Sequence, residues 1–98
     1  MINNVEESEL PGKMELFQNY PNPFNPSTTI YFSIDQTMDV RLGVFDALGR
    51  QIAVLVDQRL EEGVDEAIFD ATGLSSGLYL YRLKLNGDQH VRRMTLIK

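Results

Sequence analysis

Apolar and polar residues alternate with a period of two along most of the chain, and no segment has the 3.6-residue period of a helix. The alternation is clearest at 28–34 and 79–85. Further apolar rows lie at Val40, Leu42 and Val44, at Ile52, Val54 and Val56, and at Ala67 with Phe69. With a short edge strand within 14–18 and a last strand at 90–97, the pattern predicts about seven short strands.

Turn-forming residues separate these segments every 8–12 residues, as in two-layer β proteins. Asn86 and Gly87 predict a hairpin, because both residues tolerate a positive φ. Other tight turns are predicted at 46–49, 61–63 and 70–73. Seven short antiparallel strands joined in this way predict an all-β, immunoglobulin-like β-sandwich over residues 14–98. Residues 1–13 are polar and acidic, and we interpret them as a flexible linker.

The sixth predicted strand begins like the sixth strand of an immunoglobulin domain. In that fold a tyrosine two residues before a buried cysteine hydrogen-bonds to the backbone upstream. Tyr79 is expected to make this corner contact, and Tyr81 is expected to occupy the place of the cysteine. The pattern Phe-Asp-Ala-x-Gly occurs at Phe45 and again at Phe69, and we interpret it as two strands that end in similar turns.

The segment 19–26 contains three prolines and three asparagines, which predicts a rigid irregular loop. Its asparagines are expected to satisfy nearby backbone groups, while Tyr20 and Phe24 pack the loop onto the sandwich. Binding of calcium or a sugar by the amide oxygens is the alternative interpretation.

Composition excludes most chemistry. The 98 residues, 11.2 kDa, suffice for one small domain, and the net charge of −5 disfavours nucleic-acid binding. Without cysteine, and with His90 as the single histidine, the chain can build neither a thiolate site nor a catalytic triad. We therefore expect no enzyme and no cofactor. His90 is expected to be an exposed strand residue, and no segment approaches the length of a membrane span.

An acidic cluster is the one candidate for a metal site. Glu61 and Glu62 precede a glycine, but Asp65 and Glu66 must point to opposite faces of a strand. Calcium loops instead gather their acids around a sharp turn. We expect a solvated surface here rather than a calcium site.

Positive charge gathers at the C-terminal end of this acidic chain. Between residues 82 and 98, Asp88 is the only acid, and the bases are Arg82, Lys84, Arg92, Arg93 and Lys98. Two interpretations of the last strand stay open. It is either an ordinary strand whose Met94 and Leu96 pack in the core, or an edge with a free end that a partner extends by β-augmentation. Homodimerisation through this strand is a further possibility.

Four motifs in order resemble a known family, the type A C-terminal sorting domain of the type IX secretion system. They are LFQNYPNPFNPSTTI at 16–30, VFDALGR at 44–50, FDA with LSSGLY between 69 and 79, and RMTLIK at 93–98. Leu78 and Thr95 depart from the aliphatic residues commoner at those places. The family's fold is related to the immunoglobulin-like domain of the flagellar hook-capping protein.

The resemblance implies a secretion signal at the C-terminus of a cargo protein, read by an outer-membrane translocon in Bacteroidota-like bacteria. A sortase-like protease then cleaves the domain, within the acidic segment before Leu16, and the cargo is released or attached to the cell surface. The implied recognition residues are Arg93, Met94, Leu96, Ile97 and Lys98. The implied structural residues are Asn19, Pro21, Asn22, Pro23, Phe24, Asn25, Pro26, Asp46, Gly49, Asp70, Gly77 and Tyr79.

Two other classes of function compete with this hypothesis. A passive adhesion module for carbohydrate or a cell surface requires an exposed aromatic platform, but the chain lacks tryptophan and most of its tyrosines and phenylalanines fall on inward rows. An assembly domain like the hook cap requires partner helices or coiled segments, which 98 residues do not supply.

Overall fold

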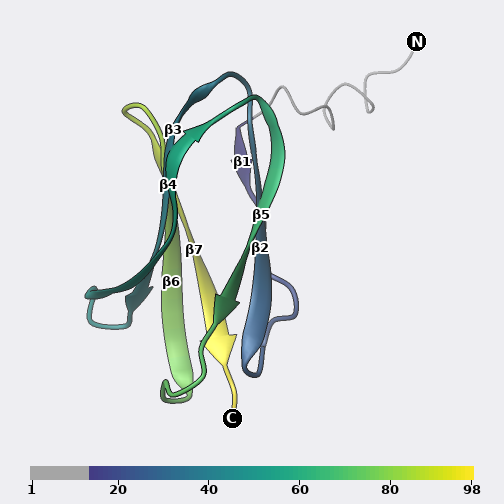
Figure 1. Ribbon diagram of the computed structural model, residues 1–98. Coiled ribbons are helices and arrows are strands. Elements are labelled where there is room, and N and C mark those ends of the chain that lie inside the picture. Colours follow the sequence, from purple (N-terminus) through teal and green to yellow (C-terminus); the bar gives the residue numbers. More distant parts are fainter. Residues whose placement is uncertain (1–13) are drawn as a thin grey trace.

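The computed structural model describes residues 14–98, and the linker predicted at 1–13 lies outside them. The described chain forms seven strands in two antiparallel sheets that face each other (Figure 1). The strands are β1 (Glu15–Leu16), β2 (Ser27–Ile34), β3 (Met38–Asp46), β4 (Gln51–Leu60), β5 (Gly63–Asp70), β6 (Gly77–Lys84) and β7 (Gln89–Leu96). The predicted all-β sandwich is therefore confirmed, with its last strand one residue earlier than expected.

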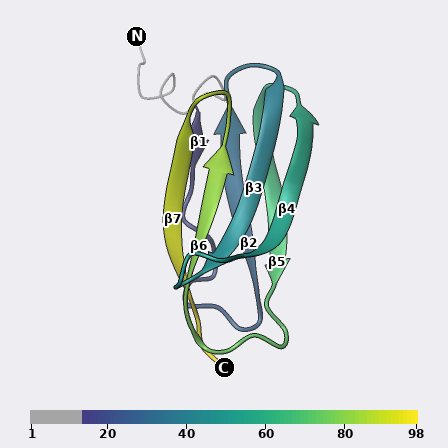
Figure 2. The same ribbon diagram turned by 90° about the vertical axis from the view of Figure 1, so that its left-hand side faces the viewer.

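The strand order places the end of the chain at a sheet edge. One sheet has the order β1-β2-β5, and the other has the order β4-β3-β6-β7 (Figure 2). β7 therefore has a hydrogen-bonded neighbour, β6, on one side only. Sheet edges expose backbone groups that must be capped, covered or paired.

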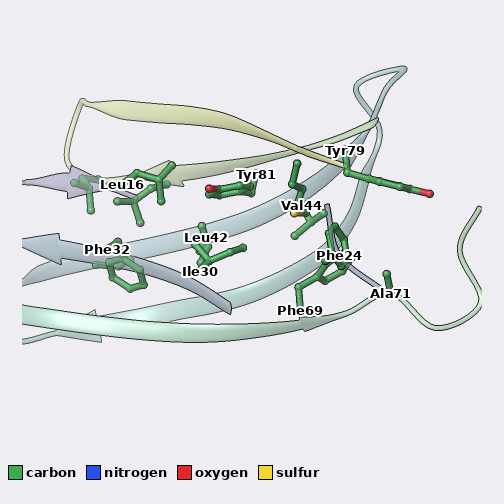
Figure 3. Packing of buried hydrophobic residues seen from close by; sticks show 14 of the residues in the cluster. Leu16, Phe24, Ile30, Phe32, Leu42, Val44, Phe69, Ala71, Tyr79 and Tyr81 are labelled. Atoms are coloured by element: carbon green, nitrogen blue, oxygen red, sulfur yellow. The ribbon is translucent and has the colours of Figure 1, made fainter. Parts of the chain in front are cut away.

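The core lies between the two sheets and is filled by the inward rows of β2, β3 and β6, as the alternation predicts (Figure 3). Its buried hydrophobic residues are Leu16, Phe24, Ile30, Phe32, Ile34, Met38, Val40, Leu42, Val44, Phe69, Ala71, Tyr79, Tyr81, Leu83, Leu85, Met94 and Leu96. The last strand thus supplies two core residues.

β4 departs from the expected alternation. Its pairing with β3 shifts register twice, once opposite Leu42 and Gly43 and once opposite Val44 and Phe45. Each shift turns the following side chains to the other face. Ile52 and Val54, expected in an inward row, are therefore exposed. Val56, from the same predicted row, does pack against the core, as do Ala53 and Leu55.

In both Phe-Asp-Ala-x-Gly segments the aspartate accepts from the N–H two residues later, but the backbone bond closes from Gly49 to Asp46 in the first and from Leu74 to Ala71 in the second. The carboxylate of Asp46 accepts hydrogen bonds from the backbone N–H groups of Leu48 and Arg50, both at 2.9 Å. That of Asp70 accepts from the backbone N–H of Thr72 at 3.0 Å and from its hydroxyl at 2.6 Å. Gly49, with a φ of +87°, completes the first turn, in a conformation that favours glycine.

These turns predict an acid-sensitive contribution to stability. The backbone N–H of Arg50 holds the pKa of Asp46 below its ordinary 3.8, and the Thr72 hydroxyl does the same for Asp70. Both pKa values are lower in the folded state than in the unfolded chain. The stabilisation is therefore complete at a pH above the unfolded-state pKa and is lost as the pH falls through the folded-state pKa. When the pH is lowered from 5 to 2.5, the melting temperature of the double variant Asp46→Asn/Asp70→Asn should therefore fall less than that of the wild type. Equal losses in thermal denaturation would contradict this.

Candidate functional site

The end of β7 is clamped by the asparagine–proline loop 19–26. The backbone N–H of Phe24 donates to the carbonyl of Thr95 at 2.9 Å, and the N–H of Ile97 donates to the carbonyl of Phe24 at 3.0 Å. The side-chain oxygen of Asn22 accepts from the N–H of Thr95 at 3.0 Å. A short parallel bridge thus covers the C-terminal half of β7. The free edge required by one of the two interpretations of this strand is therefore absent in its C-terminal half.

Phe24 anchors this clamp in the core. Its side chain is 2% exposed, and its ring meets that of Phe69 edge-to-face with centroids 6.1 Å apart (Figure 3). Tyr20, expected to pack beside it, is instead 77% exposed, because its backbone pairs with Thr29 at the sheet edge and turns the ring to solvent. The loop is therefore held by one aromatic side chain, not two.

Asn19 fixes the start of the loop. Its side-chain nitrogen donates to the carbonyl of Pro21 at 3.1 Å and to the hydroxyl of Thr28 at 2.9 Å, which confirms the expected local role. Asn22 differs, since it reaches across to β7. The other motif residues of the loop are exposed: Pro21, Pro23, Asn25 and Pro26. The peptide bonds before Pro21, Pro23 and Pro26 are cis.

Both tyrosines of β6 take the expected places. The Tyr79 hydroxyl donates to the carbonyl of Ser75 at 2.6 Å, which confirms the corner contact. Tyr81 is fully buried; its hydroxyl donates to the carbonyl of Phe17 at 2.7 Å and accepts from the N–H of Asn19 at 2.8 Å. Burial raises the pKa of this hydroxyl. Tyr81 therefore connects the four-stranded sheet to the chain that leads into the clamping loop.

The implied recognition residues divide into two groups. Met94 and Leu96 are each 1% exposed and belong to the core. Arg93, Ile97 and Lys98 are exposed on the surface. Their backbone is nevertheless held: the Gln18 side chain donates to the carbonyl of Arg93 at 2.8 Å, and the N–H of Lys98 donates to the Ser76 hydroxyl at 2.9 Å. A partner of the folded domain can touch only the second group.

Basic side chains surround the first half of β7. Nε of Arg92 donates to the carbonyl of Leu16 at 2.6 Å and bridges the gap to β1. His90, expected to be exposed, points toward that gap and is half-buried. Its Nε2 is buried and has no hydrogen-bond partner among residues 14–98. The guanidinium of Arg82 lies over the ring of Phe45, 4.6 Å from its centre.

An exposed apolar patch on the β1-β2-β5 sheet was not predicted. It consists of Tyr20, Tyr31, Val64 and Ile68, of which the last two are 60% and 64% exposed, and the exposed Glu66 lies between them, opposite Tyr31. The alternation places Tyr31 on the outward row of its strand. The sequence does not show which strands are neighbours in the sheet, and the patch depends on those neighbours.

The described part of the chain contains no arrangement of acids and histidine that could hold a metal ion. Glu61, Glu62 and Glu66 are exposed. Over residues 14–98 there is also no helix with the length and apolar character that crossing a membrane requires.

Most of the chain matches a known protein family. The family model for the secretion system C-terminal sorting domain matches residues 18–98, which include the clamping loop, both aspartate turns and all of β7. No curated protein matches the chain.

Proposed function

This chain belongs to the family of secretion system C-terminal sorting domains, the signals of type IX secretion, and we propose that the translocon recognises the clamped end of its last strand. Such a signal implies an upstream cargo and export across the outer membrane of Bacteroidota-like bacteria, to the cell surface or beyond. We further propose that a sortase-like protease removes the domain, so that the cargo is released or attached to the surface.

One observation carries the recognition proposal: the terminal motif is both anchored and displayed. Met94 and Leu96 fix the strand in the core, while Arg93, Ile97 and Lys98 face solvent. Hydrogen bonds with Phe24 and Asn22 hold the backbone of Thr95 and Ile97 in place. A translocon component that binds the folded domain would contact two cationic side chains and one aliphatic side chain at fixed spacing.

The proposal assigns no catalysis to the domain itself and no cofactor. It is supported by the composition, since His90 is the single histidine and cysteine is absent. Cleavage is proposed within residues 1–13, before the first strand.

An adhesion module is the second candidate, and the exposed patch of Tyr20, Tyr31, Val64 and Ile68 favours it. Aromatic and aliphatic groups gathered on one exposed sheet face can mark a binding surface. The patch lies on the sheet that does not contain β7, so its variants can be tested separately from those of the terminal strand.

Export of a reporter tests the recognition proposal. A fluorescent protein with an N-terminal export signal would carry residues 14–98, in a host with type IX machinery. The double variant Ile97→Ser/Lys98→Glu should lower the exported fraction at least tenfold while the fusion stays folded, because both side chains are exposed.

The control for this test is Tyr20→Ser/Ile68→Ser, which changes two exposed residues of the apolar patch. Its export should match that of the wild type. A terminal variant that is exported normally would contradict recognition of these side chains. Loss of export only in the patch variant would favour the adhesion surface as the contact with the machinery.

A further inference from the structure

We propose that the first half of β7 accepts an extended, acidic segment of a partner protein as an additional strand. This deepens the proposed function and rests on it, because the partner would be a component of the export machinery. The inference concerns the edge of β7 around Val91, next to the clamped end but outside it.

The backbone of β7 alternates between its two sides. Both backbone groups of Thr95 point outward, to the clamping loop, and the carbonyl of Arg93 also points outward, to Gln18. The pairing with β6 runs from Gln89 to Leu96 without a register shift, so Val91 points the same way as Arg93 and Thr95. Among residues 14–98, nothing pairs with the N–H or the carbonyl of Val91 on that side. The edge is therefore closed in its second half and open in its first.

Two adjoining hollows run along this open edge. One, of about 490 Å³, reaches from Val91 and Arg92 to Asn22 and Thr95. The other, of about 390 Å³, reaches from the same two residues to Met14. Together they form a groove, which we call the β7 edge groove, between β7 on one side and the chain from Met14 to Asn22 on the other, and the hydrogen bond from Arg92 to the Leu16 carbonyl crosses it. An extended segment needs this geometry, with backbone groups on one wall and space beside them.

The charge of the groove indicates an acidic occupant. Arg92 and Arg93 line it, and among residues 14–98 the only acid along its walls is Glu15. Neither arginine forms an ion pair within the described chain, whereas Arg41, Arg50 and Arg59 each pair with an aspartate. In a chain whose net charge is −5, this edge is a local concentration of positive charge. It would attract an anionic segment and orient it.

A second copy of the chain fits the groove less well. Antiparallel pairing of two β7 edges around Val91 would place Arg92 of one copy opposite His90 of the other and diagonal to its Arg92, on the same face of the strand pair. Long side chains reach such diagonal neighbours, so the two like charges would repel each other. Homodimerisation through this edge, foreseen from the sequence, therefore becomes an outcome of the test rather than the proposal.

Proline at the open edge tests the inference. Val91→Pro removes the outward N–H that an added strand requires, but it breaks no bond to β6. In the reporter fusion it should lower export about tenfold, the effect of losing one or two interface hydrogen bonds. Val91→Ala keeps the N–H and should be exported like the wild type.

Ile68→Pro is the matched control at the outer edge of β5, an edge strand of the other sheet. Thr29 on β2 lies opposite Ile68 on β5, but its backbone groups bond to Tyr20 on the other side of β2. The hydrogen bonds between β2 and β5 therefore come from the residues next to Thr29, and the N–H of Ile68 points away from β2, to solvent. This variant should also be exported normally. Melting temperatures of all variants establish that they fold.

Arg93→Glu and Lys84→Glu test the acidic character of the partner. Both residues are exposed and basic, but Arg93 lines the groove next to Val91 and Lys84 does not. The first reversal should lower export more than the second. Equal export of the two would overturn an acidic occupant.

The outcomes separate this inference from the proposed function. Normal export of folded Val91→Pro would overturn strand addition while leaving the sorting function intact. No export of the wild type, in a host that exports the same reporter with its own sorting domain, would overturn both. If light scattering shows that the wild type is a dimer and the Val91→Pro variant a monomer, the strand added at this edge would come from a second copy of the chain and not from a partner protein.

Discussion

Replacing Phe24 by alanine should lower the free energy of unfolding by about 3–5 kcal/mol, the cost of removing a buried aromatic ring. The ring is 2% exposed and packs against Phe69. Its loss also weakens the two backbone bonds that hold Thr95 and Ile97. Urea denaturation, followed by circular dichroism, measures the change. The end of β7 should become accessible to proteases before the rest of the domain.

Tyr20→Ala is the control for Phe24→Ala. The two aromatic residues belong to the same loop, but the Tyr20 side chain is 77% exposed. Its removal should change the free energy of unfolding by less than about 0.5 kcal/mol. Equal losses for the two variants would contradict the clamp, because they would show that the loop is not anchored by Phe24.

Tyr81→Phe is expected to have the second-largest effect, about 2–4 kcal/mol. The hydroxyl satisfies two backbone groups, the carbonyl of Phe17 and the N–H of Asn19, and a buried group left unpaired costs about 1–3 kcal/mol. Tyr79→Phe, which loses one bond to Ser75, should cost about 1 kcal/mol. A smaller loss for Tyr81→Phe than for Tyr79→Phe in urea denaturation would contradict this ranking.

Alkaline pH gives an independent measure of Tyr81. Its pKa is raised by burial above the ordinary value of 10.0, so the unfolded chain releases this proton first. The stabilisation is complete below pH 10 and falls as the pH rises through the folded-state value. The wild type should therefore lose more stability above pH 10 than Tyr81→Phe does.

The sequence predicted which side chains point into the core in those strands where apolar and polar residues alternate regularly. The inward rows of β2 and β6 follow from Ile30 and Phe32 and from Tyr81 and Leu83, which are all buried. The Tyr79 corner was also predictable, because the tyrosine and its acceptor Ser75 lie within one turn.

The remaining features depend on partners distant in the chain. The exposure of Ile52 and Val54 arises from register shifts against β3, which no local pattern reveals. Asn22 was expected to satisfy nearby backbone groups and Tyr20 to pack onto the sandwich, yet Asn22 caps β7 and Tyr20 faces solvent. Both outcomes depend on which distant strand the loop lies against.

The candidate site was predicted only in part for the same reason. Arg93, Met94 and Leu96 lie on the last strand as expected, whereas Ile97 and Lys98 follow its end. The hydrogen bond between Thr95 and Asn22 spans 73 positions. That contact determines which half of the edge is closed. Sequence reasoning could propose β-augmentation but could not locate it at Val91.

The most direct test of the sorting function is transfer of residues 14–98 to a protein that is not normally secreted. A fluorescent protein with an N-terminal export signal, with and without this segment, would be located by fractionation of a host with type IX machinery. A fusion to the host's own sorting domain serves as the positive control. The account predicts that the fusion reaches the medium or the cell surface while the bare reporter stays in the periplasm. Retention of a folded fusion, with export of the positive control, would contradict it.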